Sequence, residues 1–306
     1  MSQLLDVIII GAGPAGMAAA IYAKRAGLSL LVLEKTGISG GQVLSTYEVD
    51  NYPGLPMISG FDLCDSFQKH AEHLGVTIKD AEVESILDQG DSKLVMTKDA
   101  NYLSKAVIIA TGANHAKLGA RGEEQLAGMG VSYCATCDGA FFRQREVAVV
   151  GGSDVAIEDA IFLARTCKKV TLIHRRDTLR GAKILQEALF KLPNVEILWD
   201  TEVESINGTD MVENLSLYNK KEDRKFKIDV SGVFIAVGTV PKTEFVKGLV
   251  EMDEKGYIKA DETCRTSVRG IYVAGDTRTK PLRQIITATA DGANAITSLE
   301  QDLLHF

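Results

Sequence analysis

Two glycine-rich turns, each following a short apolar run, constrain this chain more than any other feature. Residues 4–10 (LLDVIII) lead into the turn GAGPAG at 11–16, then a helical pattern, and then the apolar run LSLLVLE, which ends at Glu34. Residues 145–150 (REVAVV) lead in the same way into GGSDVA at 151–156, a helical pattern through Thr166 and the strand KVTLIHRR. This order of elements is typical of dinucleotide-binding βαβ units.

The repeated pattern predicts an α/β protein made of two Rossmann-like nucleotide-binding domains, each a parallel sheet with helices packed on its faces. Three more apolar strands run into a glycine, at 107–112, 233–238 and 271–276. We expect the chain to cross between domains after the first two of these strands, through linkers at 113–117 and 241–244. The second domain (118–240) is then inserted into the first, which comprises 1–113 and 245–306.

Composition narrows the classes of partner. The formal net charge of -7 disfavours nucleic acid or an anionic membrane as the main partner. The N-terminus lacks the basic segment of a secretory signal, and no run of about 18 apolar residues suggests a membrane span. We therefore expect a cytoplasmic protein that binds neither nucleic acid nor membrane.

The first turn has the features of an FAD site. Gly11 permits the tight turn, Gly13 lets backbone approach a pyrophosphate, and Gly16 allows close packing of helix and strand. The pyrophosphate then lies at a helix N-terminus. In such units, an acid about 20 residues after the glycine turn accepts hydrogen bonds from a ribose, and Glu34 stands at this position. The alternatives are an ordinary turn between strand and helix, and a solvated strand-end charge at Glu34.

The second turn points to NADPH. At the position that corresponds to Glu34, this unit carries His174, Arg175 and Arg176, with Arg180 close behind. Guanidinium groups suit a 2′-phosphate, whereas an acid suits a bare 2′-hydroxyl. The alternative is a solvated basic patch. Ser153 replaces the second glycine of the fingerprint, and its side chain should crowd the pyrophosphate.

A closely spaced cysteine pair lies between the two turns. Cys134 and Cys137 can close a disulfide ring and reopen by thiolate exchange. Asp138 is a candidate proton donor to a leaving thiolate or to reduced flavin, or else a helix N-cap, and AFFRQR after Gly139 could begin a helix. C-x-x-C spacing also suits half a zinc site, but the remaining cysteines (Cys64, Cys167 and Cys264) are isolated, so no metal is expected.

These motifs, in this order, resemble the low-molecular-weight thioredoxin reductase family over essentially the whole chain. The matching segments are GAGPAG at 11–16, GGQ at 40–42, EVDNYPG at 48–54, ATG at 110–112, CATCDG at 134–139, HRRDTLR at 174–180, GD at 275–276 and RQ at 283–284. The family's usual G-x-G-x-x-A in the nicotinamide domain reads G-x-S-x-x-A here. Larger relatives with a wider-spaced cysteine pair and an added dimerisation domain are excluded.

The resemblance implies two sets of cofactor contacts and a homodimer. The FAD set is Gly11, Gly13, Pro14, Ala15, Gly16, Glu34, Lys35, Gly41, Gln42, Asn51, Val83, Ala110, Thr111, Gly112, Gly275, Asp276, Arg283, Gln284 and Ile285. The NADPH set is Gly151, Gly152, Ser153, Asp154, Val155, Ala156, His174, Arg175, Arg176, Arg180, Ala236, Val237 and Gly238. Family members place the counterpart of Cys137 against the flavin, with that of Cys134 as the resolving thiol. The sequence leaves that division open.

The predicted function is thioredoxin reduction: hydride passes from NADPH to FAD, the electrons pass to the Cys134–Cys137 disulfide, and exchange follows with thioredoxin or a thioredoxin-like protein. The nicotinamide site and the cysteines share one inserted domain. If both must reach the flavin ring on the same side, they cannot do so together, so that domain is expected to swing about its linkers. The alternatives are a ferredoxin-linked flavin thioredoxin reductase, a flavin-dependent dithiol oxidase, and a non-enzymatic flavin-binding sensor or structural protein.

Overall fold

The computed structural model describes residues 4–46, 49 and 51–304, so Glu48 and Asp50 of the EVDNYPG stretch lie outside the described residues. The chain divides into two compact units. Unit 1 comprises Met1–Asn114 and Val240–Phe306, and unit 2 is the segment between them, His115–Thr239. The two crossing segments contain strands β7 (Ala113–His115) and β16 (Thr239–Pro241), which pair with each other.

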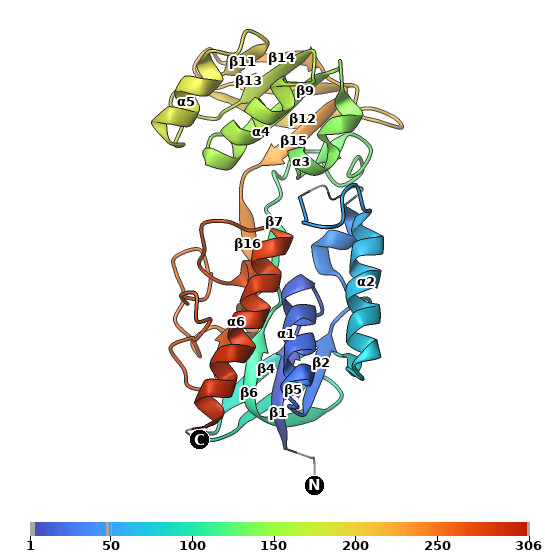
Figure 1. Cartoon of the computed structure of the whole chain (residues 1–306). Helices are drawn as coiled ribbons and strands as arrows, with labels where there is room; N and C mark the ends of the chain where they lie inside the picture. The colour runs from blue at the N-terminus through green and yellow to red at the C-terminus, as the bar shows by residue number, and fades with distance from the viewer. Residues whose placement is uncertain (1–3, 47–48, 50, 305–306) are drawn as a thin grey trace. The chain divides into compact units, whose positions relative to one another are not determined.

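Unit 1 is built on a mixed sheet (Figure 1). Strands β3 (Ile78–Asp80), β2 (Leu30–Glu34), β1 (Leu5–Ile10), β6 (Asn101–Ile109) and β17 (Ile271–Val273) run parallel in this order. An antiparallel hairpin, β4 (Val83–Asp88) and β5 (Lys93–Thr97), pairs with the first half of β6. The central strand β1 and the second half of β6 (106–109) are apolar runs buried on both faces, as is typical of parallel strands.

Helices cover one face of this sheet. Helix α1 (Pro14–Arg25) packs against α6 (Ile285–Leu303) and α2 (Gly60–His73), and the three lie side by side in Figure 1. The alanine-rich α1 buries small side chains, which lets α6 come so close that a Cβ at Gly292 would stand 2.2 Å from the Ala15 carbonyl oxygen. The described part of the unit also contains the 3₁₀ turns η1 (Gly41–Ser45), η3 (Glu244–Val246) and η4 (Gly275–Thr277).

Unit 2 contains a second parallel sheet, in the order β11 (Val195–Leu198), β10 (Lys169–Ile173), β9 (Glu146–Gly151), β15 (Gly232–Ala236) and β8 (Val131–Ser132). Its helical face carries α3 (Ala135–Asp138), η2 (Gly139–Phe142), α4 (Asp154–Ala164) and α5 (Lys183–Phe190). An antiparallel sheet of β12 (Thr201–Asn207), β13 (Asn214–Asn219) and β14 (Arg224–Asp229) packs on the opposite face.

Two local expectations differ from the structure. The second face of the unit 2 sheet is covered by strands instead of helices, because β13 supplies Leu215 and Leu217 to the core beneath β9 and β15. The segment after Gly139 forms only the short turn η2, since Gln144, with φ of 60°, turns the chain directly into β9.

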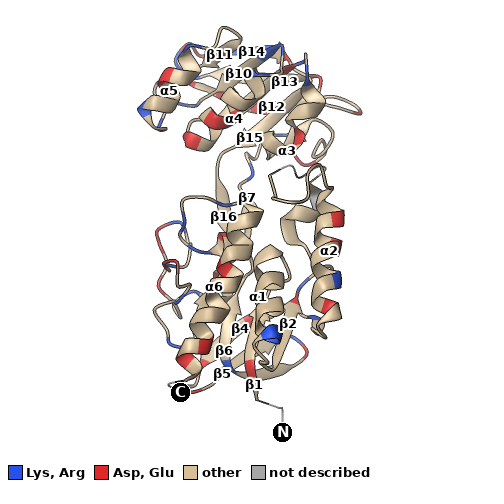
Figure 2. Ribbon diagram, viewed as in Figure 1, with Lys and Arg blue, Asp and Glu red and all other residues tan. Residues whose placement is uncertain are grey.

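Acidic and basic residues are interspersed over both units (Figure 2). Among the described helices, none has the length and apolar character needed to cross a membrane.

We predict that Gly292→Ala lowers the free energy of unfolding by about 1–3 kcal/mol, because the added methyl group forces α6 away from α1. This is opposite in sign to the gain in helix propensity that alanine brings at an exposed site. Urea denaturation followed by circular dichroism measures the change, with Thr297→Ala on the exposed face of α6 as the control, expected within about 0.5 kcal/mol of wild type. Equal stability of Gly292→Ala and wild type would contradict this packing argument.

Candidate functional site

The first glycine turn lies at the carboxyl end of β1, where four separate segments meet. Gly40 donates its N–H to the Ala12 carbonyl oxygen at 2.8 Å, which joins the 40–42 segment to the turn. A Cβ at Gly11 would stand 2.4 Å from the Ala110 carbonyl oxygen, and one at Gly275 would stand 2.9 Å from the Ala15 Cβ. The structure therefore brings residues 11–16, 40–42, 110–112 and 275–276 together, and α1 begins at Pro14 in their midst.

Glu34 ends strand β2 with its carboxylate turned toward the same turn. Its Oε2 accepts the Ala12 N–H at 2.7 Å, and its Oε1 accepts both the N–H (3.2 Å) and the hydroxyl (3.1 Å) of Thr36. Lys35 pairs with Glu82, the residue before Val83. Thr36 was not predicted from the sequence, although a hydroxyl two residues beyond the acid is a local signal for such a contact.

The start of α6 brings the last predicted FAD residues to this region. Gln284 is the N-cap of α6, forms a capping box with Thr287, and accepts a hydrogen bond from Asn51 at 3.0 Å. Arg283 lies over the ring of Tyr257, 4.0 Å from its centroid, and its Nε donates to the Asp276 carbonyl oxygen at 3.3 Å. Ile285 begins the helix.

Two observations test whether these residues fit FAD. The Oδ1 atom of Asp276 is buried and has no hydrogen-bond partner among the described residues, and burial raises the pKa of this carboxyl, although Lys280 and Arg283 oppose the shift. A hydroxyl-rich ligand supplies the missing donor. At Gly13, a Cβ would have no neighbour nearer than the Gly40 carbonyl oxygen at 4.0 Å, which leaves room for a pyrophosphate. The residues fit the cofactor.

A buried ion cluster holds the segment that carries Asp276. Asp291 accepts hydrogen bonds from Arg278 (2.8 and 3.0 Å), from Lys280 (2.7 Å) and from the Gly275 N–H (2.9 Å). Burial works to raise the pKa of Asp291, but the hydrogen bonds and charges of Arg278 and Lys280 hold it below its ordinary value. This ionised carboxylate therefore fixes residues 275–280 against α6.

The second glycine turn lies at the carboxyl end of β9 and is joined to the basic segment. Arg180 donates its N–H to the Gly152 carbonyl oxygen at 2.7 Å, and Asp154 Oδ1 accepts the Ala182 N–H at 2.6 Å. A Cβ at Gly151 would meet the Ala236 carbonyl oxygen at 2.5 Å. Residues 151–156, 174–180 and 236–238 are thus brought together. Ser153 is the N-cap of α4, with extended backbone (φ −92°, ψ 178°) that any residue adopts.

His174 is buried, whereas the neighbouring arginines are exposed. The His174 ring is buried beneath the turn, because a Cβ at Gly152 would lie 2.2 Å from it, and its Nε2 is 2.9 Å from the Thr178 carbonyl oxygen. Burial lowers the pKa of His174, and the charges of Arg180 and Arg176 act in the same direction, while hydrogen bonds to the backbone of Thr178 and Gly151 oppose the shift. The side chains of Arg175, Arg176 and Arg180 are exposed.

Cys134 and Cys137 form a disulfide in unit 2, with their Cα atoms 5.3 Å apart. The disulfide spans the short helix α3, which packs against α4, the helix that begins at the second glycine turn. Asp138 makes no capping bond; its Oδ2 accepts a hydrogen bond from Ser132 at 2.6 Å. Ser132 was not predicted, and its only sequence signal is its place two residues before Cys134.

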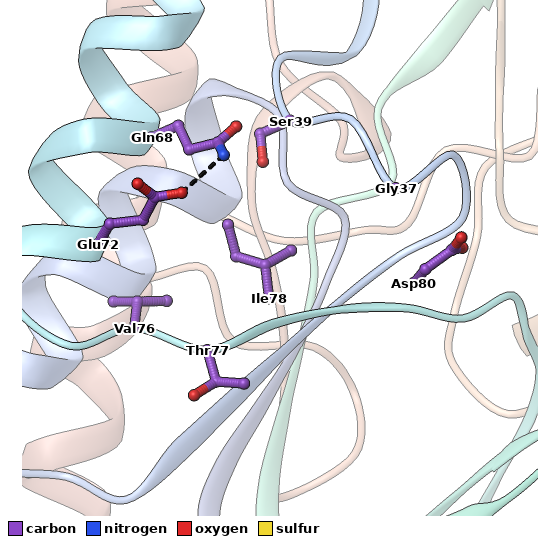
Figure 3. A pocket seen from close by; sticks show the side chains of 8 residues that line it. All are labelled: Gly37, Ser39, Gln68, Glu72, Val76, Thr77, Ile78 and Asp80. Atoms are coloured by element: carbon purple, nitrogen blue, oxygen red, sulfur yellow. Dashed lines mark hydrogen bonds between the residues drawn. The ribbon is translucent and has the colours of Figure 1, made fainter.

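Other candidate sites offer less chemistry. The remaining cysteines, Cys64, Cys167 and Cys264, are buried free thiols. Within the described part of the chain, no group of three or more His, Cys, Asp or Glu side chains could hold a metal ion. A pocket of about 480 Å³ in unit 1 is lined by Gly37, Ser39, Gln68, Glu72, Val76, Thr77, Ile78 and Asp80 (Figure 3). It includes none of the predicted site residues.

Known proteins resemble this chain over nearly its full length. Residues 5–292 match the family described as pyridine nucleotide-disulphide oxidoreductase. The thioredoxin reductase of Listeria innocua is 48% identical, covering 96% of this chain and 92% of that protein. The thioredoxin reductase of Bacillus subtilis is 44% identical, with 97% and 94% covered. The crystal structure of thioredoxin reductase from Streptococcus pyogenes is 45% identical, with a TM-score of 0.87 and 100% of both chains covered.

We predict that Asp276→Asn stabilises the protein freed of its cofactors at pH 8. A carboxyl whose pKa is raised by folding binds its proton more tightly in the folded state, so its contribution to stability falls as the pH rises past its ordinary value. The difference in free energy of unfolding between the variant and wild type should therefore become smaller as the pH is lowered towards the range in which carboxyl groups ordinarily titrate. Urea denaturation across this range measures it, with Asp99→Asn at an exposed position as the control. A variant less stable than wild type at pH 8 would show that the ionised carboxylate stabilises this state.

Proposed function

The chain belongs to the pyridine nucleotide-disulphide oxidoreductase family, and we propose that it catalyses the reduction of a thioredoxin-like protein disulfide by NADPH. The observation that carries this proposal is the Cys134–Cys137 disulfide, which lies in the same unit as a nucleotide turn and its basic segment. Matches to thioredoxin reductases over nearly the whole chain support it. FAD and NADPH are the cofactors that this chemistry uses.

Unit 1 is the proposed FAD-binding domain. Its contacts are residues 11–16, 34–35, 41–42, 51, 83, 110–112, 275–276 and 283–285. The open space above Gly13 receives the pyrophosphate, and Glu34 accepts from a ribose hydroxyl. Asp276 accepts from a further hydroxyl, which would satisfy its free Oδ1. Bound there, FAD supplies a two-electron carrier between the nicotinamide and the disulfide.

Unit 2 is the proposed NADPH-binding domain. Residues 151–156 and 236–238 surround the nucleotide, and the exposed guanidinium groups of Arg175, Arg176 and Arg180 bind the 2′-phosphate. His174 holds the turn and the basic segment in place from beneath, since its buried ring lies between Gly152 and the Thr178 carbonyl. Its role is therefore to position the site.

The cysteines carry out the exchange. Two electrons and two protons open the Cys134–Cys137 bond to a dithiol; one of its thiols loses its proton, and the resulting thiolate attacks the partner disulfide to form a mixed disulfide. The other cysteine attacks that bond, the Cys134–Cys137 disulfide forms again, and the partner leaves as a dithiol. Asp138 donates a proton to a leaving sulfur. In sum, NADPH and one proton reduce one protein disulfide to two thiols.

The working form is a cytoplasmic homodimer whose partner is thioredoxin or a thioredoxin-like small protein, with no role for nucleic acid or membrane. The net charge of -7 supports the exclusion of polyanionic partners. Full-length likeness to thioredoxin reductases supports the choice of partner.

Cys134→Ser and Cys137→Ser should each abolish thioredoxin reduction while NADPH still bleaches the flavin, because the hydride step precedes the disulfide step. Anaerobic mixing with NADPH, followed by a steady-state assay with thioredoxin, separates the two steps. Cys167→Ala, at a buried free thiol of the same unit, is the matched control and should retain turnover. Thioredoxin turnover by either serine variant would mean that another group is the redox centre.

We predict that NADPH is preferred to NADH by at least about tenfold in kcat/KM, since charge-assisted contacts to a phosphate contribute about 1.5–3 kcal/mol. Arg175→Ala combined with Arg176→Ala should mostly erase the preference, whereas Arg224→Ala, on exposed strand β14, should leave it unchanged. Ser153→Gly should improve the use of both nucleotides alike. If the flavin stays oxidised with NADPH but is bleached by reduced ferredoxin, the electron donor is ferredoxin and not NADPH.

A further inference from the structure

Ser132 connects the two ends of the segment that carries the redox disulfide. It is the last residue of β8 and its side chain is buried, with the residue 5% exposed. Its Oγ accepts the N–H of Cys134 at 3.1 Å, and it lies 2.6 Å from Asp138 Oδ2 and 3.3 Å from the Cys134 carbonyl oxygen. One hydroxyl therefore contacts both the first cysteine and the proposed proton donor.

The positions of these acceptors suit both protonation states of Asp138. A hydroxyl has one hydrogen to donate and two lone pairs that accept. While the carboxylate is ionised, Ser132 donates to Oδ2. Once Oδ2 carries a proton, it can donate to Ser132 Oγ, and the serine hydrogen turns to the Cys134 carbonyl oxygen. Both states are then hydrogen-bonded without movement of any heavy atom.

We infer that Ser132 is a positioning residue for the thiol step, which keeps Asp138 in one place while that carboxyl gives up and regains its proton. The inference rests on the proposed function, in which Asp138 protonates a sulfur that leaves when a disulfide bond breaks. The proton passes from Asp138 Oδ2 to that thiolate, which becomes a thiol, and the carboxylate later regains a proton from water. Ser132 itself gains and loses no proton overall, because only the direction of its O–H changes.

The backbone contact gives Ser132 a second effect on the same segment. The Asp138 N–H donates to the Cys134 carbonyl oxygen at 3.1 Å, so Cys134 and Asp138 are already joined through the backbone of α3. Ser132 adds a side-chain connection between these two residues from outside the helix. Loss of its hydroxyl should leave the disulfide intact but free the carboxyl to turn away, so the effect is expected on turnover with thioredoxin.

A double-mutant cycle tests this inference. Wild type, Ser132→Ala, Asp138→Asn and the combined variant are compared for kcat with thioredoxin, with FAD content checked for each. Ser132→Ala should lose about tenfold, the factor typical of one hydrogen bond to a charged group, but less than about twofold when Asp138→Asn is already present. Ser132→Thr, which keeps the hydroxyl, should recover most of the loss. Ser205→Ala, at a buried serine on β12, is the matched control and should behave as wild type.

Two outcomes overturn the inference while leaving the proposed function intact. If Ser132→Ala lowers kcat equally with and without Asp138→Asn, Ser132 acts on the strand end and not through Asp138. If Ser132→Ala keeps full activity, Ser132 has no role in the thiol step. If Ser132→Ala fails to retain FAD, Ser132→Val replaces it in the same cycle and is compared with Ser132→Thr, which has the same shape but keeps the hydroxyl. Failure of the wild type to reduce thioredoxin would overturn the proposed function itself, and this inference with it.

Discussion

Backbone packs directly on backbone where α1 begins, and the arrangement of unit 1 depends on this contact. A Cβ at Gly16 would stand 1.8 Å from the Gly11 carbonyl oxygen, and one at Gly292 would stand 2.2 Å from that of Ala15. Sheet, α1 and α6 therefore lie together without side chains between them at these points. Because α1 begins at the carboxyl end of β1, the same contact brings the glycine turn beside the start of α6, where polar groups from distant segments converge.

Within this frame, two neighbouring carboxyl groups have opposite environments. Asp291 is buried but receives four hydrogen bonds from Gly275, Arg278 and Lys280, as a buried charge requires. Burial raises the pKa of Asp276, and its Oδ1 atom has no hydrogen-bond partner among the described residues. The first arrangement stabilises the segment, and the second leaves a hydrogen-bonding need that a ligand can meet. The scaffold thus satisfies its own charge and leaves the polar atom at the site unpaired.

Local patterns predicted much of this protein because they act over few residues. Apolar runs predicted β1, β6, β9 and β15, and the glycine turns predicted a helix after each turn; in the structure these helices begin inside the turn sequences, at Pro14 and Asp154. The C-x-x-C spacing predicted the disulfide that the structure contains. The antiparallel sheet over unit 2 was missed because its strands mix polar with apolar residues and form no continuous apolar run. Burial of His174 was missed because it depends on a contact with Gly152, on a different strand end.

The sequence by itself determined the two βαβ units, the cysteine pair and the change from Glu34 to a basic cluster in the second unit, since each of these is written in neighbouring residues. Only the tertiary structure decided which polar groups meet. Ser132 finds Asp138 through the path of β8 into α3, and Asp276 lies beside the first turn through the packing of α6 on α1. The first meeting depends on the path of the chain between two consecutive elements, and the second on how closely elements distant in the sequence approach each other, which is set by side-chain volumes throughout the core.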